Sequence, residues 1–95
     1  MDTPNGDGIN DTFALAYVLL KLTRPATAFL TIYDLSGRRV RHIASGPIFS
    51  GQRVQIWDGL SEDRRLVLPG LYLWSLRIEA DSGVVERQGA VGVAY

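Results

Sequence analysis

The alternation of apolar and polar residues most constrains the fold of this chain. It is clearest in residues 71–80, LYLWSLRIEA, and in residues 27–35, TAFLTIYDL. The apolar side chains on one face are Tyr72, Trp74, Leu76 and Ile78 in the first segment, and Ala28, Leu30 and Ile32 in the second. Because residues two apart share a face of a β-strand, each segment predicts a strand with one buried face.

Turn residues separate these segments at a spacing of about ten residues, which is typical of β-sandwiches. Ser36-Gly37 predicts a tight hairpin turn, and Asp81-Ser82-Gly83 predicts another. The remaining segments are interpreted as a return strand (38–44), a loop (45–51), a strand ending in Trp-Asp-Gly (52–59), a polar connection (60–70), and a last strand or two (84–95). The pattern predicts an all-β, antiparallel sandwich with six or seven short strands and no convincing helix.

Residues 12–22, TFALAYVLLKL, are apolar at both even and odd positions, so their period alone does not separate helix from strand. Alanine, leucine and lysine favour a helix, and Asp11 or Thr12 could cap one. The short length, the stop at Pro25 and the strand-rich remainder favour a fully buried strand. We expect one face to meet the core and the other to meet a neighbouring domain or a partner protein.

Length and charge exclude several classes of protein. The chain has 95 residues, enough for one domain, and its ten basic and ten acidic residues cancel. No net field therefore favours nucleic acid or an anionic membrane. There are no cysteines and no apolar stretch of the roughly 18–20 residues that a membrane span needs. Met1 leads directly into a glycine-rich loop, so we expect a domain excised from a longer parent whose export signal lies elsewhere.

Residues 1–11 are interpreted as a calcium-loop-like lead-in to a sandwich domain over residues 12–95. The run TPNGDGIND places oxygen-bearing side chains on a backbone hinged by glycines, which suits a hard cation such as calcium. An EF-hand is excluded, because Thr3 and Ala14 stand where carboxylates are needed. The predicted ligands are the side chains of Asn5, Asp7 and Asp11 and the carbonyl of Ile9, with Asp2 as a further contributor.

The alternative interpretation of this run is a set of Asx-turns, in which Asn and Asp side chains bond to their own backbone. With so few carboxylates, a calcium site would bind in the weak extracellular range, roughly 10⁻⁴–10⁻³ M.

Three aromatic residues, Trp57, Tyr72 and Trp74, could stack on sugar rings, which would make the chain a carbohydrate-binding module. The core interpretation is favoured, since Trp74 shares its face with Leu76 and Ile78 and sandwiches bury an aromatic residue at a strand end. Asp58 is then a corner residue whose carboxylate bonds to nearby backbone amides.

The basic run Arg38-Arg39-Val40-Arg41-His42 divides between two faces of a strand, so we interpret it as a solvated edge strand rather than a nucleic-acid site. His42 is the only histidine, and no pair of carboxylates suggests glycoside hydrolysis. The sequence therefore predicts a non-catalytic domain.

Four sequence motifs carry a family resemblance over nearly the whole chain: TPNGDGINDTF, LTIYDLSGRRV, IWDG and LPGLYLW. In this order and spacing they resemble the immunoglobulin-like C-terminal domains of secreted bacterial surface proteins. These are the gliding-motility-associated and type IX secretion sorting domains, which are related to the immunoglobulin-like domain of the flagellar hook-capping protein. The chain departs from the sorting domains at one point, because no basic residue follows Arg87.

The resemblance implies an immunoglobulin-like sandwich of about seven strands at the end of an exported bacterial protein, which is secreted or held at the cell surface. It implies export, surface attachment or structural spacing as the role. The implied partners are the adjacent domain of the parent and components of the secretion system or cell envelope. Self-association through open sheet edges is a further alternative.

Overall fold

The computed structural model describes residues 13–94, which form six strands and no helix. The strands are β1 (Phe13–Leu19), β2 (Ala26–Tyr33), β3 (Arg39–Ile48), β4 (Gly51–Trp57), β5 (Gly70–Ala80) and β6 (Gly83–Val93). They make a four-stranded sheet in the order β3-β2-β5-β6 and a two-stranded sheet of β1 and β4. All pairings are antiparallel. The predicted all-β sandwich is confirmed, with six strands in the described residues.

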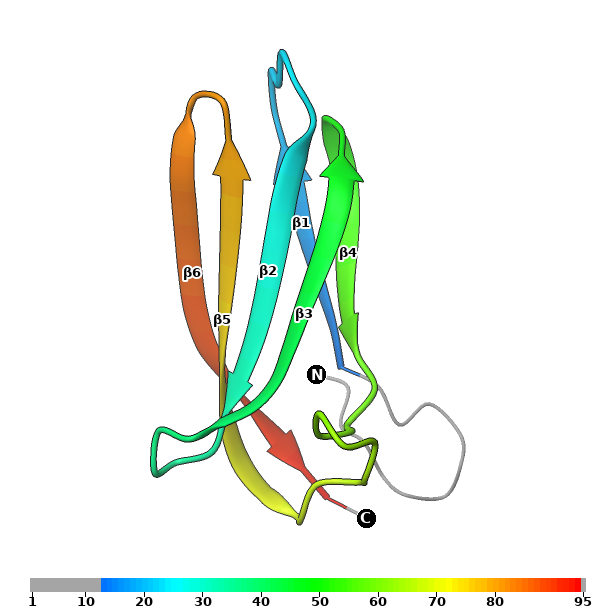
Figure 1. The fold of residues 1–95 in the computed structure, drawn as a ribbon, viewed down its shortest axis with the longest axis vertical. Helices are drawn as coiled ribbons and strands as arrows, with labels where there is room; N and C mark the ends of the chain where they lie inside the picture. Colours follow the sequence, from blue (N-terminus) through cyan, green and yellow to red (C-terminus); the bar gives the residue numbers. More distant parts are fainter. Residues whose placement is uncertain (1–12, 95) are drawn as a thin grey trace.

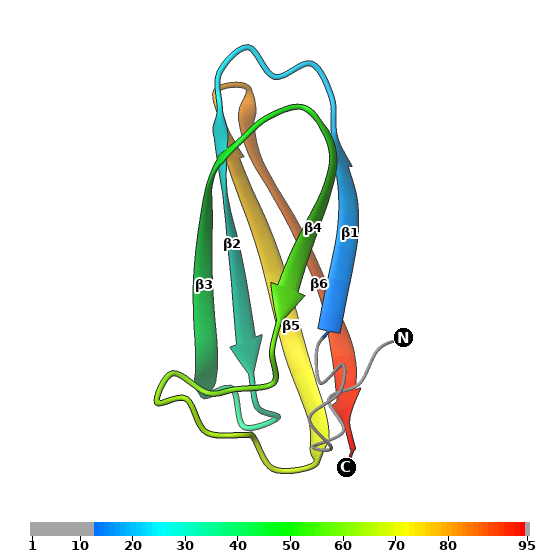
Figure 2. The same cartoon turned by 90° about the vertical axis from the view of Figure 1, so that its right-hand side faces the viewer.

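The two sheets face one another as layers, and Figure 2 shows β1 and β3 on opposite sides of the molecule. The smaller sheet lies behind β2 and β3, while β5 and β6 extend beyond it on one side (Figure 1). β1 begins and β6 ends at the same end of the sandwich (Figure 1). Within residues 13–94, no helix has the length and hydropathy for a membrane crossing.

The core lies between the layers and follows the alternation of the sequence. The large side chains that are fully buried are Trp57, Leu30, Ile32 and Val91. Register explains this grouping, because Leu30 lies opposite Leu76 of β5 and Tyr72 lies opposite Val91 of β6. Tyr72 and Leu76 are also buried, so the predicted inner face of residues 71–80 is confirmed.

The prediction that residues 12–22 form a fully buried strand is wrong in one respect. A strand is present, but its inward side chains are buried at Phe13 and half-buried at Leu15, Tyr17 and Leu19, and they alternate with exposed positions. A two-stranded sheet is covered on one face only, so its outer face remains exposed. In the register of β1 and β4, Ala14 lies opposite Ile56 and Ala16 opposite Val54, which makes this outer face apolar.

The prediction of a loop over residues 45–51 is also wrong, since β3 continues to Ile48 and β4 begins at Gly51. The register of β2 and β3 shifts between Ala26 and Ala28, where Gly46 and Pro47 form a bulge with a cis peptide bond. Proline is tolerated here because β3 is an edge strand, whose outward amides need no partner strand.

Both predicted hairpin turns are present. Gly37 has a φ of 87° and Gly83 a φ of 134°, values that favour glycine. Residues 84–93 belong to one strand, β6, rather than two.

Candidate recognition surface

The predicted calcium ligands Asn5, Asp7, Ile9 and Asp11 lie outside the described residues, so their prediction stands as it was made from the sequence. Between Phe13 and Ala94, no group of three or more His, Cys, Asp and Glu residues comes together in a way that could hold a metal ion.

The aromatic residues are core rather than a platform. Trp57 is fully buried and its ring meets that of Tyr72 edge-on, with centroids 5.9 Å apart. The Trp57 indole Nε1 donates to the carbonyl of Leu60 at 2.9 Å, which satisfies its one polar atom. Trp74 is half-buried and packs against Phe13 at a centroid distance of 6.1 Å. A flat, exposed stacking surface for sugars is therefore not formed by these three side chains.

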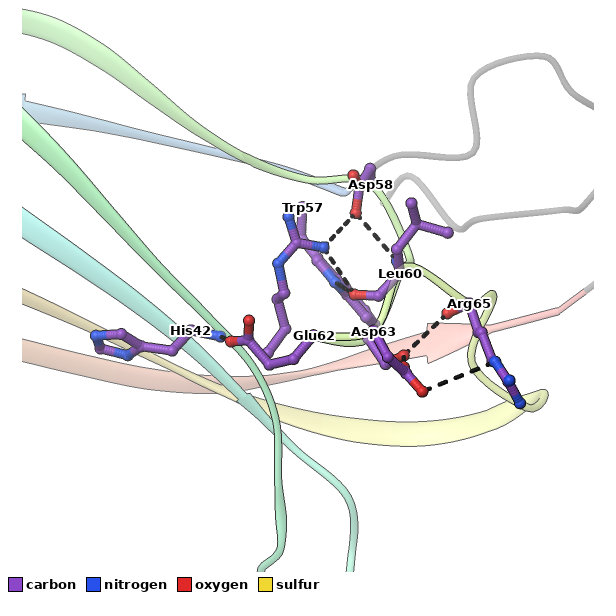
Figure 3. Close-up of polar contacts among 9 residues, drawn as sticks. His42, Trp57, Asp58, Leu60, Glu62, Asp63 and Arg65 are labelled. Atoms are coloured by element: carbon purple, nitrogen blue, oxygen red, sulfur yellow. Dashed lines mark hydrogen bonds and ion pairs between the residues drawn. The ribbon is translucent and has the colours of Figure 1, made fainter.

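Asp58 organises the corner that follows β4 (Figure 3). Its Oδ1 accepts a hydrogen bond from the Leu60 amide and another from the Arg41 guanidinium, each at 3.0 Å. Arg41 Nη1 also donates to the Leu60 carbonyl at 3.0 Å. Since Arg41 belongs to β3 and Asp58 follows β4, this network joins the two sheets. The corner role predicted for Asp58 is confirmed.

The segment from residue 58 to residue 66 also covers the outer edge of β3 near its start, at Val40 and His42. The Glu62 amide donates to the Val40 carbonyl at 3.0 Å, and the His42 amide donates to Glu62 Oε1 at 2.6 Å (Figure 3). Groups that an edge strand would otherwise present to a foreign strand are therefore satisfied within the chain. We call this side of the sandwich, where β3 and β4 are closed by residues 58–66, the closed flank.

A shallow hollow lies on the outer face of the four-stranded sheet. Its volume is about 290 Å³, and its lining residues are Phe29, Thr31, Tyr33, His42, Ser75, Arg77, Glu79 and Glu86. The imidazole of His42 stacks on Phe29 with ring centroids 5.7 Å apart and forms a hydrogen bond with the Thr31 hydroxyl at 2.9 Å. These contacts hold His42 flat against the sheet.

One arginine lies between two glutamates beside this hollow, so the three groups leave one net negative charge. Arg77 Nε donates to Glu79 Oε2 at 2.9 Å, and Arg77 Nη1 lies 3.8 Å from Glu86 Oε1. The hydrogen bond to Glu79, followed by the charges of both glutamates, raises the pKa of Arg77. The hollow thus presents aromatic edges, hydroxyl groups and one more carboxylate than the single arginine neutralises.

The resolved pKa shifts all move away from neutral pH. Burial raises the pKa of Tyr17 and of Tyr72 above the ordinary value of 10.0. Hydrogen bonds from Ser36 and Arg38 lower the pKa of Asp34 below 3.8, and a hydrogen bond from Ser61 lowers that of Asp63. A general acid or base works best with a pKa near the working pH, and none of these four groups is shifted toward it.

Residues 1–93 match the family described as CHU_C type IX secretion signal domain. The chain belongs to this family. A type IX secretion signal domain is a sorting module, and the protein that carries it is secreted or held at the cell surface. A comparison with curated proteins found no match.

The signal domain is similar in fold to three solved structures. FlgD from P. aeruginosa gives a TM-score of 0.67 at 23% identity, covering 86% of this chain and 61% of that one. FlgD from Xanthomonas campestris, whose structure concerns hook capping in flagellar assembly, gives 0.62 at 17% identity, covering 86% and 56%. Dimeric latent PorU from Porphyromonas gingivalis gives 0.61 at 18% identity, covering 93% and 10%. The signal domain thus spans less than two thirds of each of these proteins, and the likeness establishes the fold.

Sequence reasoning missed two features of the signal domain. The cover over β3 depends on Glu62, which is one of several charged residues in a polar connection. The hollow depends on the register of β2 with its two neighbours, which places Thr31 opposite His42 of β3 and Ser75 of β5. Alternation showed that Phe29, Thr31 and Tyr33 share a face, but it could not show which side chains of other strands lie beside them.

Proposed function

We propose that this domain is a non-catalytic sorting module that directs an exported protein through the type IX system to the cell surface. The observation that carries the proposal is the family match over residues 1–93 of a 95-residue chain. It is supported by the chemistry of the described residues, in which His42 is held against Phe29 and Thr31 and Arg77 is paired with Glu79.

The adjacent domain of the parent and components of the secretion system or envelope are the proposed partners. The apolar outer face of β1 and β4 supports a contact with the adjacent domain, because Val54 and Ile56 are 58% and 52% exposed there. An apolar patch on a neutral surface is a common mark of such a contact. The longest dimension, 42 Å, also supports a spacing role beside sorting.

The sorting role is tested by fusing residues 1–95 to the C-terminus of a periplasmic reporter in a type IX-competent host. We expect the reporter at the cell surface or in the medium, and in the periplasm of a strain without a working type IX system. A fusion carrying Leu30→Asp, which unfolds the core, is the control for the need for a folded domain. Retention of the unaltered fusion in the periplasm, with the domain folded, would leave spacing as the role.

We also propose that Asn5, Asp7 and Asp11, with the carbonyl of Ile9, bind calcium weakly. The spacing of these oxygen groups between glycines supports this proposal. Calcium at about ten times its dissociation constant should stabilise the folded domain by about 1.4 kcal/mol, which is roughly 5–10 °C in the midpoint of thermal unfolding.

The measurement compares thermal unfolding in excess EDTA, in calcium and in magnesium. Asp7→Asn combined with Asp11→Asn should remove the calcium effect without changing the midpoint in EDTA. An equal midpoint in EDTA and calcium would reduce the run to a set of Asx-turns.

A further inference from the structure

An apolar groove lies on the side of the sandwich opposite the closed flank. It has a volume of about 380 Å³ and runs between the end of β1 and the hairpin of β5 and β6. One wall is formed by Val18, Leu20 and Leu22, and the other by Ile78, Val85 and Arg87. We call this side, with the free edges of β1 and β6, the open flank.

The groove arises because the two sheets differ in width. A two-stranded sheet faces a four-stranded one, so part of β5 and β6 extends beyond β1 (Figure 1). The difference in width changes the solvent exposure of two residues that are paired in register, one on β5 and one on β6. Ile78 is 5% exposed, whereas Val85, its partner in register, is 47% exposed. Near the hairpin, the inner face of the larger sheet is therefore covered at β5 and uncovered at β6, whereas Val91 farther along β6 is buried.

The edge of β1 beside this groove has no partner strand within the described part of the chain. β1 pairs with β4 along Phe13–Leu19, and its other edge carries backbone N–H and C=O groups that face away from β4. An extended segment added at this edge would lie about 4.8 Å from β1, over the uncovered part of the larger sheet. It would make the smaller sheet three strands wide.

The charge of the groove is positive. Its lining includes Arg87 and no carboxylate. Beside it, Lys21 and Arg24 follow β1, and one carboxylate, Asp81, accepts a hydrogen bond from Thr23, so the cations outnumber the carboxylate at this end of the flank. Arg87 donates to the backbone carbonyl of Glu86, and no ion pair is formed by Arg87 within residues 13–94. Two copies joined symmetrically through this flank would bring like charges together, which disfavours a second copy as the occupant.

We propose that the open flank binds an extended segment of a partner protein by β-strand addition to β1. The segment has apolar residues at alternate positions, which face Leu20, Ile78 and Val85, and a carboxylate among them, which pairs with Arg87. Main-chain hydrogen bonds to β1 supply affinity, and the groove supplies specificity for the alternate side chains. This binding is separate from sorting and would persist in the isolated domain.

The test uses the whole 95-residue chain and a fluorescent, end-capped peptide of about nine residues. Threonine occupies the outward positions, and three valines and one glutamate occupy the inward positions. We expect saturable binding by fluorescence anisotropy, with slower amide hydrogen exchange in β1. A peptide of the same sequence with N-methyl groups on alternate amides should not bind, because it cannot complete the main-chain hydrogen bonds.

Two variants in the groove and one control on β4 locate the site. Val85→Lys should weaken binding at least about tenfold. Val54→Lys, at a similarly exposed valine on the outer face of β4, should leave binding within about twofold. Arg87→Glu should lose the original peptide and recover affinity for a peptide whose glutamate is replaced by lysine.

Three results would overturn the proposal. One is absence of peptide binding to the folded wild-type chain. Another is loss of selectivity, seen either as equal affinity for the N-methylated peptide or as equal affinity of the Val85→Lys variant for the original peptide. The third is a dimer by sedimentation that Val85→Lys dissociates, because a second copy would then be the occupant.

Discussion

The closed flank and the open flank differ in how the backbone groups at their strand edges are satisfied. Both are places where the edges of two sheets come together and where backbone groups lack a strand to pair with. At the closed flank, Glu62 occupies the edge of β3 and the Arg41–Asp58 pair joins the sheets. At the open flank, β1 and β6 each have one neighbour among the described strands, and an apolar groove separates them.

The comparison shows that one sandwich can have covered strand edges on one side and uncovered strand edges on the other. The difference comes from the connections. Residues 58–69 link β4 to β5 across the layers, and this long segment brings polar groups to β3. On the other side, β5 and β6 are joined directly by a tight turn, which leaves no chain to cover β6.

Removal of the Trp57 side chain tests how much stability the closed flank supplies. Trp57→Ala should cost about 3–5 kcal/mol, because it removes a fully buried ring together with the hydrogen bond to Leu60. Such a loss is a large part of the 5–15 kcal/mol typical of a domain. Urea unfolding measures it, with the exposed Val54→Ala on the same strand as a control within about 0.5 kcal/mol. A loss near 1 kcal/mol for Trp57→Ala would contradict the packing described.

Two glycines on β6 sharpen the comparison, because a neighbouring side chain lies against one of them and leaves space at the other. A Cβ on Gly89 would lie 2.5 Å from Cζ2 of Trp74, whereas a Cβ on Gly92 would meet no atom within 4 Å. Gly89→Ala should therefore cost about 1–3 kcal/mol through overpacking. Gly92→Ala should be near neutral in the same urea titration. Equal effects of the two changes would show that Trp74 does not lie across β6.

The contact between the sheets at the closed flank can be broken with Arg41→Met and Asp58→Ala. The side chain of Arg41 is 17% exposed and that of Asp58 is 43% exposed, so solvent screens the pair in part. Each change should cost about 1–1.5 kcal/mol, mainly through lost hydrogen bonds to the Leu60 backbone. A double-mutant cycle should give a coupling of about 0.5–1 kcal/mol. Zero coupling would mean that the two residues act separately.

Substitution of Asp34 should cause the smallest of these changes in stability, and this change should depend on pH. Hydrogen bonds from Ser36 and Arg38 lower its pKa in the folded state below the ordinary value of 3.8. The ionised form is thus favoured by folding, so its stabilisation is complete above pH 3.8 and is lost as the pH falls through the lower, folded pKa. Asp34→Asn should flatten the acid-side loss of stability, measured by urea unfolding below and above this range. An unchanged slope would contradict the assignment.

The strands and their buried faces could be predicted because alternation is local. The inner faces of β2 and β5 are examples, and so is the corner at Asp58, whose residues are close in sequence. The end of β3 was missed because Gly46-Pro47 signals a turn unless the strand is known to lie at an edge. Glu62 and Val85 were missed for a related reason, since their surroundings depend on which strands become neighbours across long separations.

The placement of the first and last strands has a mechanical consequence. β1 begins and β6 ends at the same end of the sandwich (Figure 1). A pull that separates these two points acts across the strands rather than along them, so hydrogen bonds would break one after another instead of all together. β6 pairs only with β5 among the described strands and would peel first. Traction applied at these two points would therefore open the larger sheet from β6 rather than shear the two sheets apart.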